Sequence, residues 1–448
     1  MTSDREDVEA QAPQNGTQIQ FIKGAEPVGL NRFDPSQTAS SDDFLVKIRE
    51  SMAEAMSAKN VAFLLGSGCS SLIDGRGHQV GIPTMKPLAE EFASQNGGRG
   101  SDVFLTTTEK GALESSLGVA VKASPYSENL EALMEVLYSW RFSLRASTHS
   151  RHESHLAIVD KAVCKLKRFL FERCTSGPFS NGNDSVQKLY ESFYRKLVYR
   201  DRSLPRPWIF TTNYDLFNET AMDRLGLPYS NGFSGTIERR FNPSVFRYAL
   251  AEQLDVSSRK WSAVDGFAYL CKLHGSISWI EDNQGLFPVR ELQKPDENHD
   301  SLMIYPTPAK HAFSFSSPYS DLFREFHSRI VKEQSVLFVV GYGFGDEHVN
   351  NIIYQALTVP TFRLVIFAAP DAEGEIAKLR ELKDSRIWII GGSEPDTGRT
   401  AHYFDYFVEK LMPELPGDQV DKAIKKVLHD LVGRGESEAG TGGNNIDS

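Results

Sequence analysis

The segment TTNYD, residues 211–215, places an amide and a carboxylate directly after the apolar run Trp208–Thr211. A continuous apolar run of this kind predicts a strand that is buried on both faces. Asn213 and Asp215 are therefore expected at the carboxyl end of a strand, where their side chains can orient a ribose or a water. Either side chain can instead cap a helix that starts near Leu216, and the sequence leaves both explanations open.

The segment KLHGS, residues 272–276, places a histidine at the end of a second predicted strand, Phe267–Lys272. Imidazole is the side chain best suited to proton transfer near neutral pH. The glycine that follows His274 lets a backbone or a ligand approach closely. A single histidine can also be structural, so the segment favours a general base without excluding a packing role.

A glycine-rich segment, GSGCSS at residues 66–71, directly follows the apolar run Val61–Leu65. Glycines allow a backbone to approach a diphosphate, and the N-terminus of a following helix offers free N–H groups to its charge. Ser71 stands where the usual dinucleotide fingerprint has its third glycine. A plain strand-to-helix turn explains this segment equally well.

A second glycine-rich segment, GYGFGDEH at residues 341–348, follows the strongly apolar run Ser335–Val340. Its three glycines at alternate positions leave little side-chain bulk, so the open backbone can receive a nucleotide. Asp346 can cap the helix predicted over Glu347–Leu357. A purely structural turn has no evident need for three glycines.

The elements that hold these four segments alternate between strand and helix along the chain. This alternation predicts an α/β fold with a doubly wound, mainly parallel, Rossmann-like sheet. Ligands of such sheets bind beyond the carboxyl ends of the strands, so the four segments are expected along one edge. The further predicted strands are Leu302–Tyr305, Arg363–Ala368 and Arg386–Ile390, and the further predicted helices are Asp42–Ala58, Ala372–Lys383 and about Thr400–Leu411.

Between about residues 100 and 206 the pattern changes to amphipathic helices, which predicts a helical insertion. Apolar residues at helical spacing fall within Leu130–Trp140 and Leu156–Leu170. From Arg141 to Arg206 there are fourteen Lys and Arg against six Asp and Glu. This excess fits solvated helix faces, or a surface for a partner protein or a nucleic acid.

Composition and charge narrow the class of protein. The chain of 448 residues has a formal net charge of -10, which argues against extensive non-specific binding to nucleic-acid phosphates. Its N-terminus lacks the basic start and apolar run of a signal peptide. No stretch approaches the roughly twenty apolar residues that span a bilayer. We therefore expect a cytoplasmic protein that makes no contact with a membrane.

Metal ligands at suitable spacing are scarce. The cysteines form no C-x-x-C pair, so neither a structural zinc nor a disulfide framework is expected. His149, His152 and His155 are spaced by three and fall on one side of a helix, as metal ligands can. An exposed polar face explains the same spacing without a metal. The four cysteines are Cys69, Cys164, Cys174 and Cys271.

Together the four segments carry a family resemblance. GSGCS followed by GIP at residues 81–83, then TTNYD, KLHGS and GYGFGDEHVN, resembles the sirtuin fold in the branch found in bacterial anti-phage defence. The resemblance covers roughly Asn60 to Ile390, less the helical insertion. It implies that NAD is the substrate and that the nicotinamide–ribose bond is hydrolysed to give nicotinamide and ADP-ribose.

The resemblance also implies roles for individual residues. His274 corresponds to the family's general base, and Asn213 and Asp215 to the Asn and Asp beside the nicotinamide ribose. The residues expected to contact NAD are Gly66, Ser67 and Gly68 at the diphosphate, Gly341 and Gly343 at the adenosine half, and also Ser70, Thr212, Gly275, Ser276 and Phe344.

The sequence departs from the deacylase sirtuins at two places. Their zinc cysteines are absent, and no metal is expected. Thr84 and Met85 stand where the deacylases have an Asp that holds the nicotinamide amide and then an aromatic residue. The alternatives to hydrolysis are a protein deacylase or ADP-ribosyltransferase, and a non-catalytic NAD-binding scaffold for an ATPase.

The expected organisation follows from these patterns. Residues 1–40 are predicted to form a mostly disordered arm, in which Gln20–Leu30 can dock on the fold. A sirtuin-like NAD-binding domain is expected over 41–413, and a C-terminal helix near Val420–Leu431 with a disordered tail over 414–448. The resemblance implies a homo-oligomer activated by a partner, a HerA-type DNA-translocating ATPase or, as the alternative, a short Argonaute.

Overall fold

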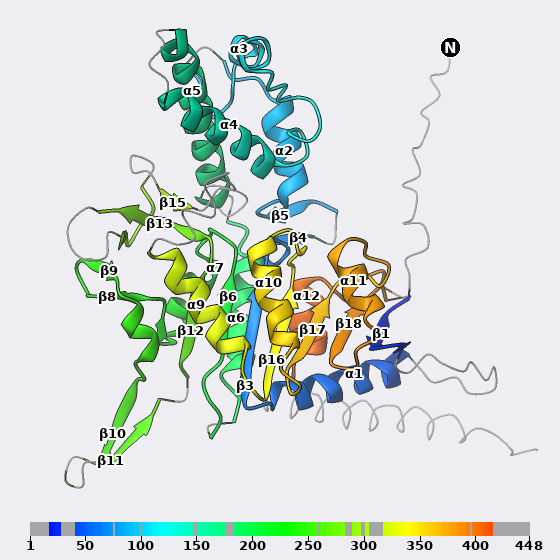
Figure 1. The fold of residues 1–448 in the computed structure, drawn as a ribbon. Helices are drawn as coiled ribbons and strands as arrows, with labels where there is room; N and C mark the ends of the chain where they lie inside the picture. The colour runs from blue at the N-terminus through cyan, green and yellow to red at the C-terminus, as the bar shows by residue number, and fades with distance from the viewer. Residues whose placement is uncertain are drawn as a thin grey trace, which may run out of the picture.

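The computed structural model describes residues 18–27 and 41–414, apart from gaps at 75–76, 99, 147–150, 176–181, 202, 256, 258–259, 265, 283–288, 297–300, 304–316 and 395–396. Its centre is a nine-stranded sheet with the order β2-β1-β18-β17-β16-β3-β6-β12-β7 (Figure 1). The strands are β1 (Gln20–Lys23), β2 (Glu26–Pro27), β3 (Asn60–Leu65), β6 (Trp208–Thr211), β7 (Tyr229–Ser230), β12 (Ala268–Lys272), β16 (Ser335–Val340), β17 (Arg363–Phe367) and β18 (Ile387–Gly391).

Neighbouring strands from β18 to β7 are all parallel, and both faces of the sheet are buried. Val61, Phe63 and Leu65 of β3 lie in one apolar core, whereas Ala62 and Leu64 lie in the other. Successive side chains of a strand point to opposite faces, so this division places a core on each side. The doubly wound, mainly parallel α/β fold expected from the sequence is confirmed.

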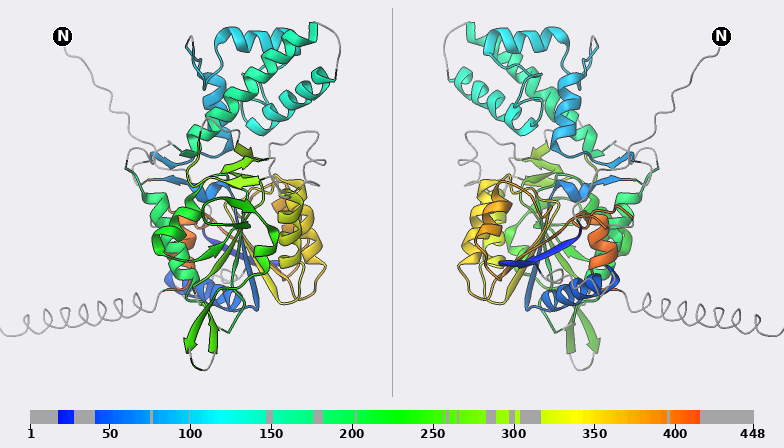
Figure 2. Two further views of the ribbon diagram at one scale, coloured as in Figure 1. Left: turned by 90° about the vertical axis from the view of Figure 1, so that its left-hand side faces the viewer. Right: turned by 90° about the vertical axis from the view of Figure 1, so that its right-hand side faces the viewer.

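Helices cover both faces of this sheet (Figures 1 and 2). Phe63 shows how one layer packs, because its ring stacks on Phe338 of the neighbouring strand at 5.0 Å and meets Phe193 of a covering helix edge-on at 5.2 Å. The first face carries α1 (Ser41–Met56), α6 (Ser185–Leu197), α7 (Phe217–Leu225) and the short α12 (Phe404–Tyr406), and the second carries α9 (Tyr319–Ile330), α10 (Glu347–Leu357) and α11 (Glu375–Glu381).

A further group of helices stands beyond the carboxyl ends of the strands, at the top of Figure 1. The group is built on buried apolar faces such as Leu133 and Leu137 against Val159 and Phe169. The position of the expected insertion, about residues 100–206, and the other domain bounds stay predictions. The helices of the group are α2 (Met85–Ser94), α3 (Thr107–Leu117), α4 (Leu130–Arg145) and α5 (Arg151–Thr175).

Many of the Lys and Arg side chains between Arg141 and Arg206 form ion pairs within the chain. Some of their partners are carboxylates that precede Arg141 in the sequence. Lys165, whose side chain is 7% exposed, lies 2.7 Å from Glu109. Arg173 binds Glu91, and Arg168 lies 3.6 Å from Asp102. The count of fourteen against six therefore overstates the charge that this segment presents to solvent.

A second, antiparallel sheet lies beside the first and was not expected from the sequence. Leu302–Tyr305 was expected as a strand of the parallel sheet, but the strand is Ser301–Met303 and pairs antiparallel with β13. The segment is too short to show the difference between a buried parallel strand and an antiparallel one. The order is β15-β13-β14-β9-β8, with β8 (Phe233–Ser234), β9 (Arg239–Phe241), β13 (Gly275–Glu281), β14 (Val289–Glu291) and β15 (Ser301–Met303).

The segment after the first glycine-rich loop is not a helix, contrary to expectation. One 3₁₀ turn, Ser67–Ser70, leads into a hairpin of β4 (Ser71–Ile73) and β5 (Gln79–Gly81). The chain turns back because Asp74 exchanges hydrogen bonds with His78, through its backbone N–H and its carboxylate. No long helix N-terminus therefore follows this loop. A second hairpin, β10 (Ala251–Asp255) with β11 (Lys260–Ala263), stands apart from both large sheets.

The two ends of the described chain meet the central sheet. β1 pairs antiparallel with β18, and Phe21 packs edge-on against Trp388 at 5.4 Å, so the expectation that Gln20–Leu30 docks is met over Gln20–Lys23. Near the other end, Thr400 bridges to Ser393, which prevents the predicted helix from starting there. Only α12 and a π-helical turn, Phe407–Leu411, form.

The expected C-terminal helix near Val420–Leu431 and most of the expected N-terminal arm lie outside the described residues. Among the helices that the structure does describe, none combines the length and the apolar character needed to cross a membrane.

Candidate active site at the carboxyl edge of the sheet

A cavity of about 350 Å³ lies where the central strands end. Its volume falls within the range of about 300–1,000 Å³ that is usual for small-molecule sites. Its wall combines the loops after β3, β6, β12 and β16 with residues from α2, α4 and α5. The expected site residues in the wall are Ser67, Ser70, Thr212, Asn213, Asp215, His274, Gly341 and Gly343.

Ser70 joins the two polar residues of the TTNYD segment. Its hydroxyl donates to Oδ2 of Asp215 over 2.7 Å and accepts from Nδ2 of Asn213 over 2.9 Å. The same Nδ2 also donates to the carbonyl of Gly66 over 2.9 Å. Both amide hydrogens of Asn213 are thus used inside the protein, and the residue borders the cavity.

Asp215 fulfils both roles that the sequence left open. Its Oδ1 accepts the backbone N–H of Phe217 over 3.1 Å at the start of α7, which is a helix-capping contact. Its Oδ2 accepts from Ser70, and the residue borders the cavity. Capping therefore fixes the carboxylate in place and does not remove it from the site.

His274 is buried and faces a carboxylate. Its Nε2 lies 3.0 Å from Oδ2 of Asp346, and both side chains are less than one-tenth exposed. In spite of this short distance, Nε2 makes no hydrogen bond among the described residues. Oδ1 of Asp346 accepts the N–H groups of His348 and Val349 and caps α10. One carboxylate thus holds a helix and faces the candidate base.

The two glycine-rich loops pack backbone against backbone. The N–H of Gly66 donates to the carbonyl of Val340 and that of Gly68 to the carbonyl of Gly341, both over 2.9 Å. A Cβ on Gly66 would lie 2.4 Å from the Gly341 oxygen. Gly66 and Gly68 therefore serve contact between loops, and their N–H groups are already bonded. Open space faces Gly343, where a Cβ would meet nothing within 4 Å.

Like Gly66 and Gly68, three further expected contact residues are absent from the cavity wall. Phe344 is 3% exposed and packs in the apolar core of the second face, with a positive φ of 55°. The Ser276 hydroxyl bonds Ser278 and the carbonyl of Tyr214. Gly275 has a φ of 88° where the chain turns into β13, so this glycine is needed for the turn itself.

Helices α4 and α5, which lie beyond the sheet, form the roof of the cavity, and this was not expected from the sequence. Asn129 and Glu131, at the N-terminus of α4, line the same cavity as His274. Leu170 and Cys174 of α5 add apolar contact. The helical pattern predicted these elements, but nothing in their sequence signals which turn faces the sheet edge.

The charges around the cavity are negative. Asp215, Glu131 and Asp346 line it, and within the described part of its wall there is no Lys or Arg. Such a site suits a ligand that carries or develops positive charge. A phosphate bound here would need backbone N–H groups, and the glycine-rich loop at residues 343–345 is where they can be offered, because Asp346 already takes the N–H groups of His348 and Val349 at the start of α10.

Burial controls the hydroxyl and thiol groups nearby. Burial raises the pKa of the Tyr190 hydroxyl well above its usual value, and the charge of Asp215 adds to this. Tyr190, from α6, lies 3.2 Å from the Ser70 hydroxyl and so joins the same network. Desolvation followed by the charge of Asp215 raises the pKa of the Cys174 thiol to about 12. This thiol is therefore protonated at neutral pH and is not a nucleophile.

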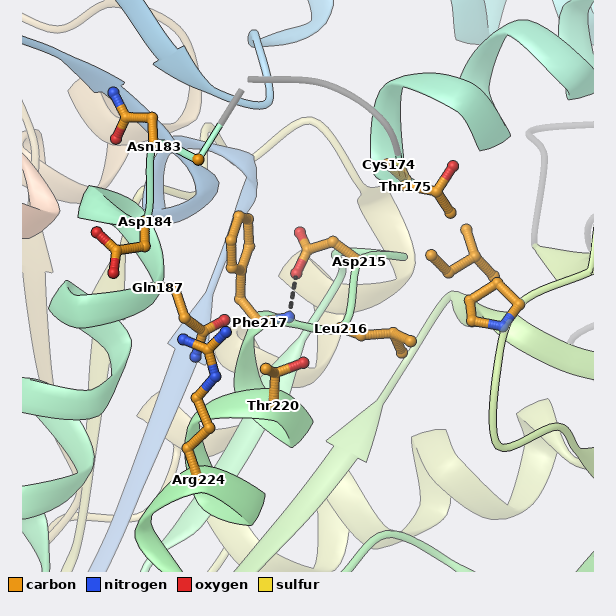
Figure 3. A pocket seen from close by; sticks show the side chains of 13 residues that line it. Cys174, Thr175, Asn183, Asp184, Gln187, Asp215, Leu216, Phe217, Thr220 and Arg224 are labelled. Carbon is orange, nitrogen blue, oxygen red and sulfur yellow. Dashed lines mark hydrogen bonds between the residues drawn. The ribbon is translucent and has the colours of Figure 1, made fainter. Parts of the chain in front are cut away.

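A second cavity of about 430 Å³ meets the first at Asp215 and Cys174. Figure 3 shows Asp215 bonded to Phe217 at this cavity, with Gln187 and Arg224 on the α6 and α7 side. Asp215 therefore separates two spaces, and only the first contains His274.

The structure shows no group of three or more metal-ligating side chains among the described residues. All four cysteines are free, with Cys69 and Cys271 buried. His152 and His155 lie on α5 with ring centres 6.3 Å apart, and His149 lies outside the described residues.

One protein-family model matches part of the chain. Residues 207–390 match the family model described as a SIR2-like domain. The matched stretch contains TTNYD, KLHGS and the second glycine-rich loop, but not the first glycine-rich loop. The match supports a sirtuin-like protein with an NAD-using function of the sirtuin type. None of the curated proteins compared with the chain matches it.

Proposed function

We propose that this protein is an NAD hydrolase that breaks the nicotinamide–ribose bond and releases nicotinamide and ADP-ribose. The observation that carries the proposal is the meeting of His274, Asn213 and Asp215 in the wall of one cavity. They come from two separate strand ends, within a region similar to SIR2-like domains. Neither capping nor core packing explains why an imidazole and an amide should line the same cavity.

The chemistry required of the protein is modest. Nicotinamide is a cationic leaving group that departs as a neutral molecule, so no strong general acid is needed. The transition state resembles an oxocarbenium ion, as in glycoside hydrolysis. The carboxylates of Asp215, Glu131 and Asp346 lie around the cavity and can stabilise that positive charge.

His274 and Asn213 have different roles in the proposed reaction. The oxygen of a water bonds to C1′ of the ribose while the bond to nicotinamide breaks and its electron pair stays on the nicotinamide nitrogen. His274 accepts the proton of that water as general base. Asn213, whose amide is held by Gly66 and Ser70, orients the ribose or the water.

The residues present fit NAD as a ligand. Gly343 and Gly345 leave open space beside the cavity, so a diphosphate can approach the backbone of residues 343–345. Because Gly66 and Gly68 spend their N–H groups on the second loop, the diphosphate is proposed to lie on residues 343–346. The proposed contact with the diphosphate therefore shifts from the first glycine-rich loop to the second.

The biological role follows from the resemblance to sirtuin-like defence proteins. We infer that the chain is the NAD-depleting effector of an anti-phage system and acts as a homo-oligomer. Its proposed regulator is a HerA-type DNA-translocating ATPase, with a short Argonaute as the alternative. The roof helices α4 and α5 supply cavity residues, so a regulator that moves them would change the site.

The test is product analysis after incubation with NAD, alone and with each candidate partner. Equal amounts of nicotinamide and free ADP-ribose are expected. ADP-ribose attached to protein, or deacylation that depends on NAD, would show transfer to a second substrate instead. Binding of NAD without turnover under every condition would leave a scaffold and overturn the proposal.

A further inference from the structure

A lysine is buried directly beneath the candidate site. The Lys272 side chain is 1% exposed, and it precedes His274 by two residues on the same segment. Its ammonium group donates to the carbonyl of Asp215, to the carbonyl of Tyr214 over 3.4 Å and to Oε1 of Glu219 over 3.0 Å. An ammonium group has three N–H donors, so this geometry uses all of them.

Two of the three acceptors are backbone carbonyls of the turn that carries the candidate catalytic side chains. Lys272 is paired with Thr211 in the parallel register of β12 and β6, so its side chain reaches the segment that follows Thr211. The Tyr214 carbonyl also accepts the N–H of Ile277 over 3.1 Å. The turn after β6 is thereby tied to the segment that carries His274.

The third acceptor extends this connection to a helix. Glu219 lies in the first turn of α7, is 7% exposed, and has no hydrogen-bond partner for its Oε2 among the described residues. Burial raises the pKa of this carboxyl, and the charge of Lys272 opposes that rise. A buried carboxylate with one oxygen that lacks a hydrogen-bond partner costs stability, so packing alone does not favour this arrangement.

Burying an ion pair gains little stability. Taking two charges out of water costs several kcal/mol for each ion, on the order of what their attraction returns, and an apolar pair of similar volume is often as stable. The contacts of Lys272 are with the backbone of residues 214–215. These contacts hold the backbone of the turn, and with it the direction in which the side chains of Asn213 and Asp215 point.

We propose that Lys272 is a positioning residue for NAD cleavage. It holds the turn 213–215 in register with His274, so that amide, carboxylate and imidazole face the cavity together. This inference rests on the proposed hydrolase function. Lys272 touches no reacting atom, and its removal should lower kcat while changing KM for NAD little, because a small misplacement of catalytic groups costs up to about a hundredfold in rate.

The test variant removes both charges, Lys272→Met with Glu219→Leu, so that no unpaired ion is left buried. The matched control is Lys110→Met. Lys110 is also a buried lysine, 7% exposed, that donates to two backbone carbonyls, those of Ala93 over 2.8 Å and Gln95 over 2.5 Å. It lies in α3 and is absent from the wall of the cavity, so it should affect stability and leave kcat unchanged.

Two readouts are measured on the full chain with its activating partner. The first is kcat and KM for nicotinamide release, where a fall in kcat of about tenfold to hundredfold is expected for the double variant only. The second is hydrogen exchange of peptides that cover residues 212–217, which should speed up in the double variant and not in the control. If the double variant does not fold, Lys272→Met with Glu219→Gln, which also removes both charges and the donors of Lys272, is measured in the same way.

The outcomes separate this inference from the proposed function. Unchanged exchange of residues 212–217, or a wild-type kcat in a folded variant, would overturn the role of Lys272. Faster exchange together with a wild-type protein that never releases nicotinamide would instead support the positioning of the turn and contradict the hydrolase. An equal fall of kcat in the control would mean that loss of any buried lysine is sufficient.

Discussion

The Nε2 of His274 and the Oδ2 of Asp346 lie 3.0 Å apart, although the strands that precede them are separated in the sheet by β3 and β6. The loops after β12 and β16 therefore lean toward each other across the ends of the two strands between them. Because Asp346 also caps α10, the carboxylate has a fixed position. The imidazole thus faces a charge that cannot rotate away.

Replacing Asp346 with Asn should separate the two roles of this side chain. Asn is as good a helix cap as Asp, so α10 and the melting temperature should change little. The charge beside the imidazole is lost, and with it the stabilisation of the imidazolium that forms when His274 takes a proton, so kcat for nicotinamide release should fall about tenfold or more while KM changes less. The matched control is Asp384→Asn, which alters a surface turn with Arg386. Equal rates in wild type and Asp346→Asn would show that this carboxylate only caps the helix.

Removing the candidate catalytic side chains should abolish turnover and spare the fold. His274→Ala and Asn213→Ala should each lower nicotinamide release by about a hundredfold to ten-thousandfold, because one loses the general base and the other the positioning of ribose or water. Both act in one step, so the double variant should be little worse than the worse single variant. NAD binding should weaken less than turnover, because residues 343–346 remain.

A melting curve for each variant provides the control, since neither side chain belongs to an apolar core. If His274→Ala is folded and hydrolyses NAD at the wild-type rate, the proposed mechanism is wrong and the histidine is structural.

NAD cleavage should proceed without a bound metal. The cavity wall offers three carboxylates and one imidazole, and the chemistry proposed for them uses a water activated by His274 alone. Extensive dialysis against a chelator should leave the rate of nicotinamide release unchanged, and added zinc should not raise it. Loss of activity on chelation, restored by one equivalent of metal per chain, would refute this.

Exposed basic residues of the segment Arg141–Arg206 should contribute to assembly or regulation. Arg145, Lys188 and Arg195 have side chains more than half exposed, and ion pairs at such exposed side chains are each worth less than about 1 kcal/mol. Changing all three to Glu should therefore weaken self-association or partner binding, measured by light scattering and pull-down, and leave NAD binding intact.

Arg324→Glu with Lys378→Glu is the control for that experiment, because both side chains are 71% exposed on α9 and α11. Assembly that survives the triple reversal as well as it survives the control would favour solvated helix faces. The same result would mean that the excess of positive charge in residues 141–206 does not serve to bind a partner.

The central sheet could be predicted from sequence because its strands are continuous apolar runs. Trp208–Thr211 and Ser335–Val340 were placed at their observed bounds. The second sheet was not predicted, since its strands other than Gly275–Glu281 are two or three residues long, as Phe233–Ser234 is, and too short for any periodicity. Short strands gain their structure from partners distant in sequence.

The site itself was predicted in part. Strand ends identified His274, Asn213 and Asp215, because parallel strands bring their carboxyl ends to one edge. The roof residue Glu131 gives no such signal, since an acidic residue in the first turn of a helix is also common for electrostatic reasons. Gly66 shows the opposite case: its pattern was recognised, but the close neighbour of that backbone is another loop, not an open space.

The pairing of β1 with β18 has a consequence for how the protein can be handled. β1 covers the outer edge of β18, an apolar strand that would otherwise expose a row of unpaired N–H and C=O groups. A chain shortened to begin after Pro27 would offer Ile387–Gly391 as a template on which a second molecule can add a strand. Such a truncated protein should associate or aggregate through a surface that the intact chain keeps closed, and its oligomeric state would then say nothing about the native assembly.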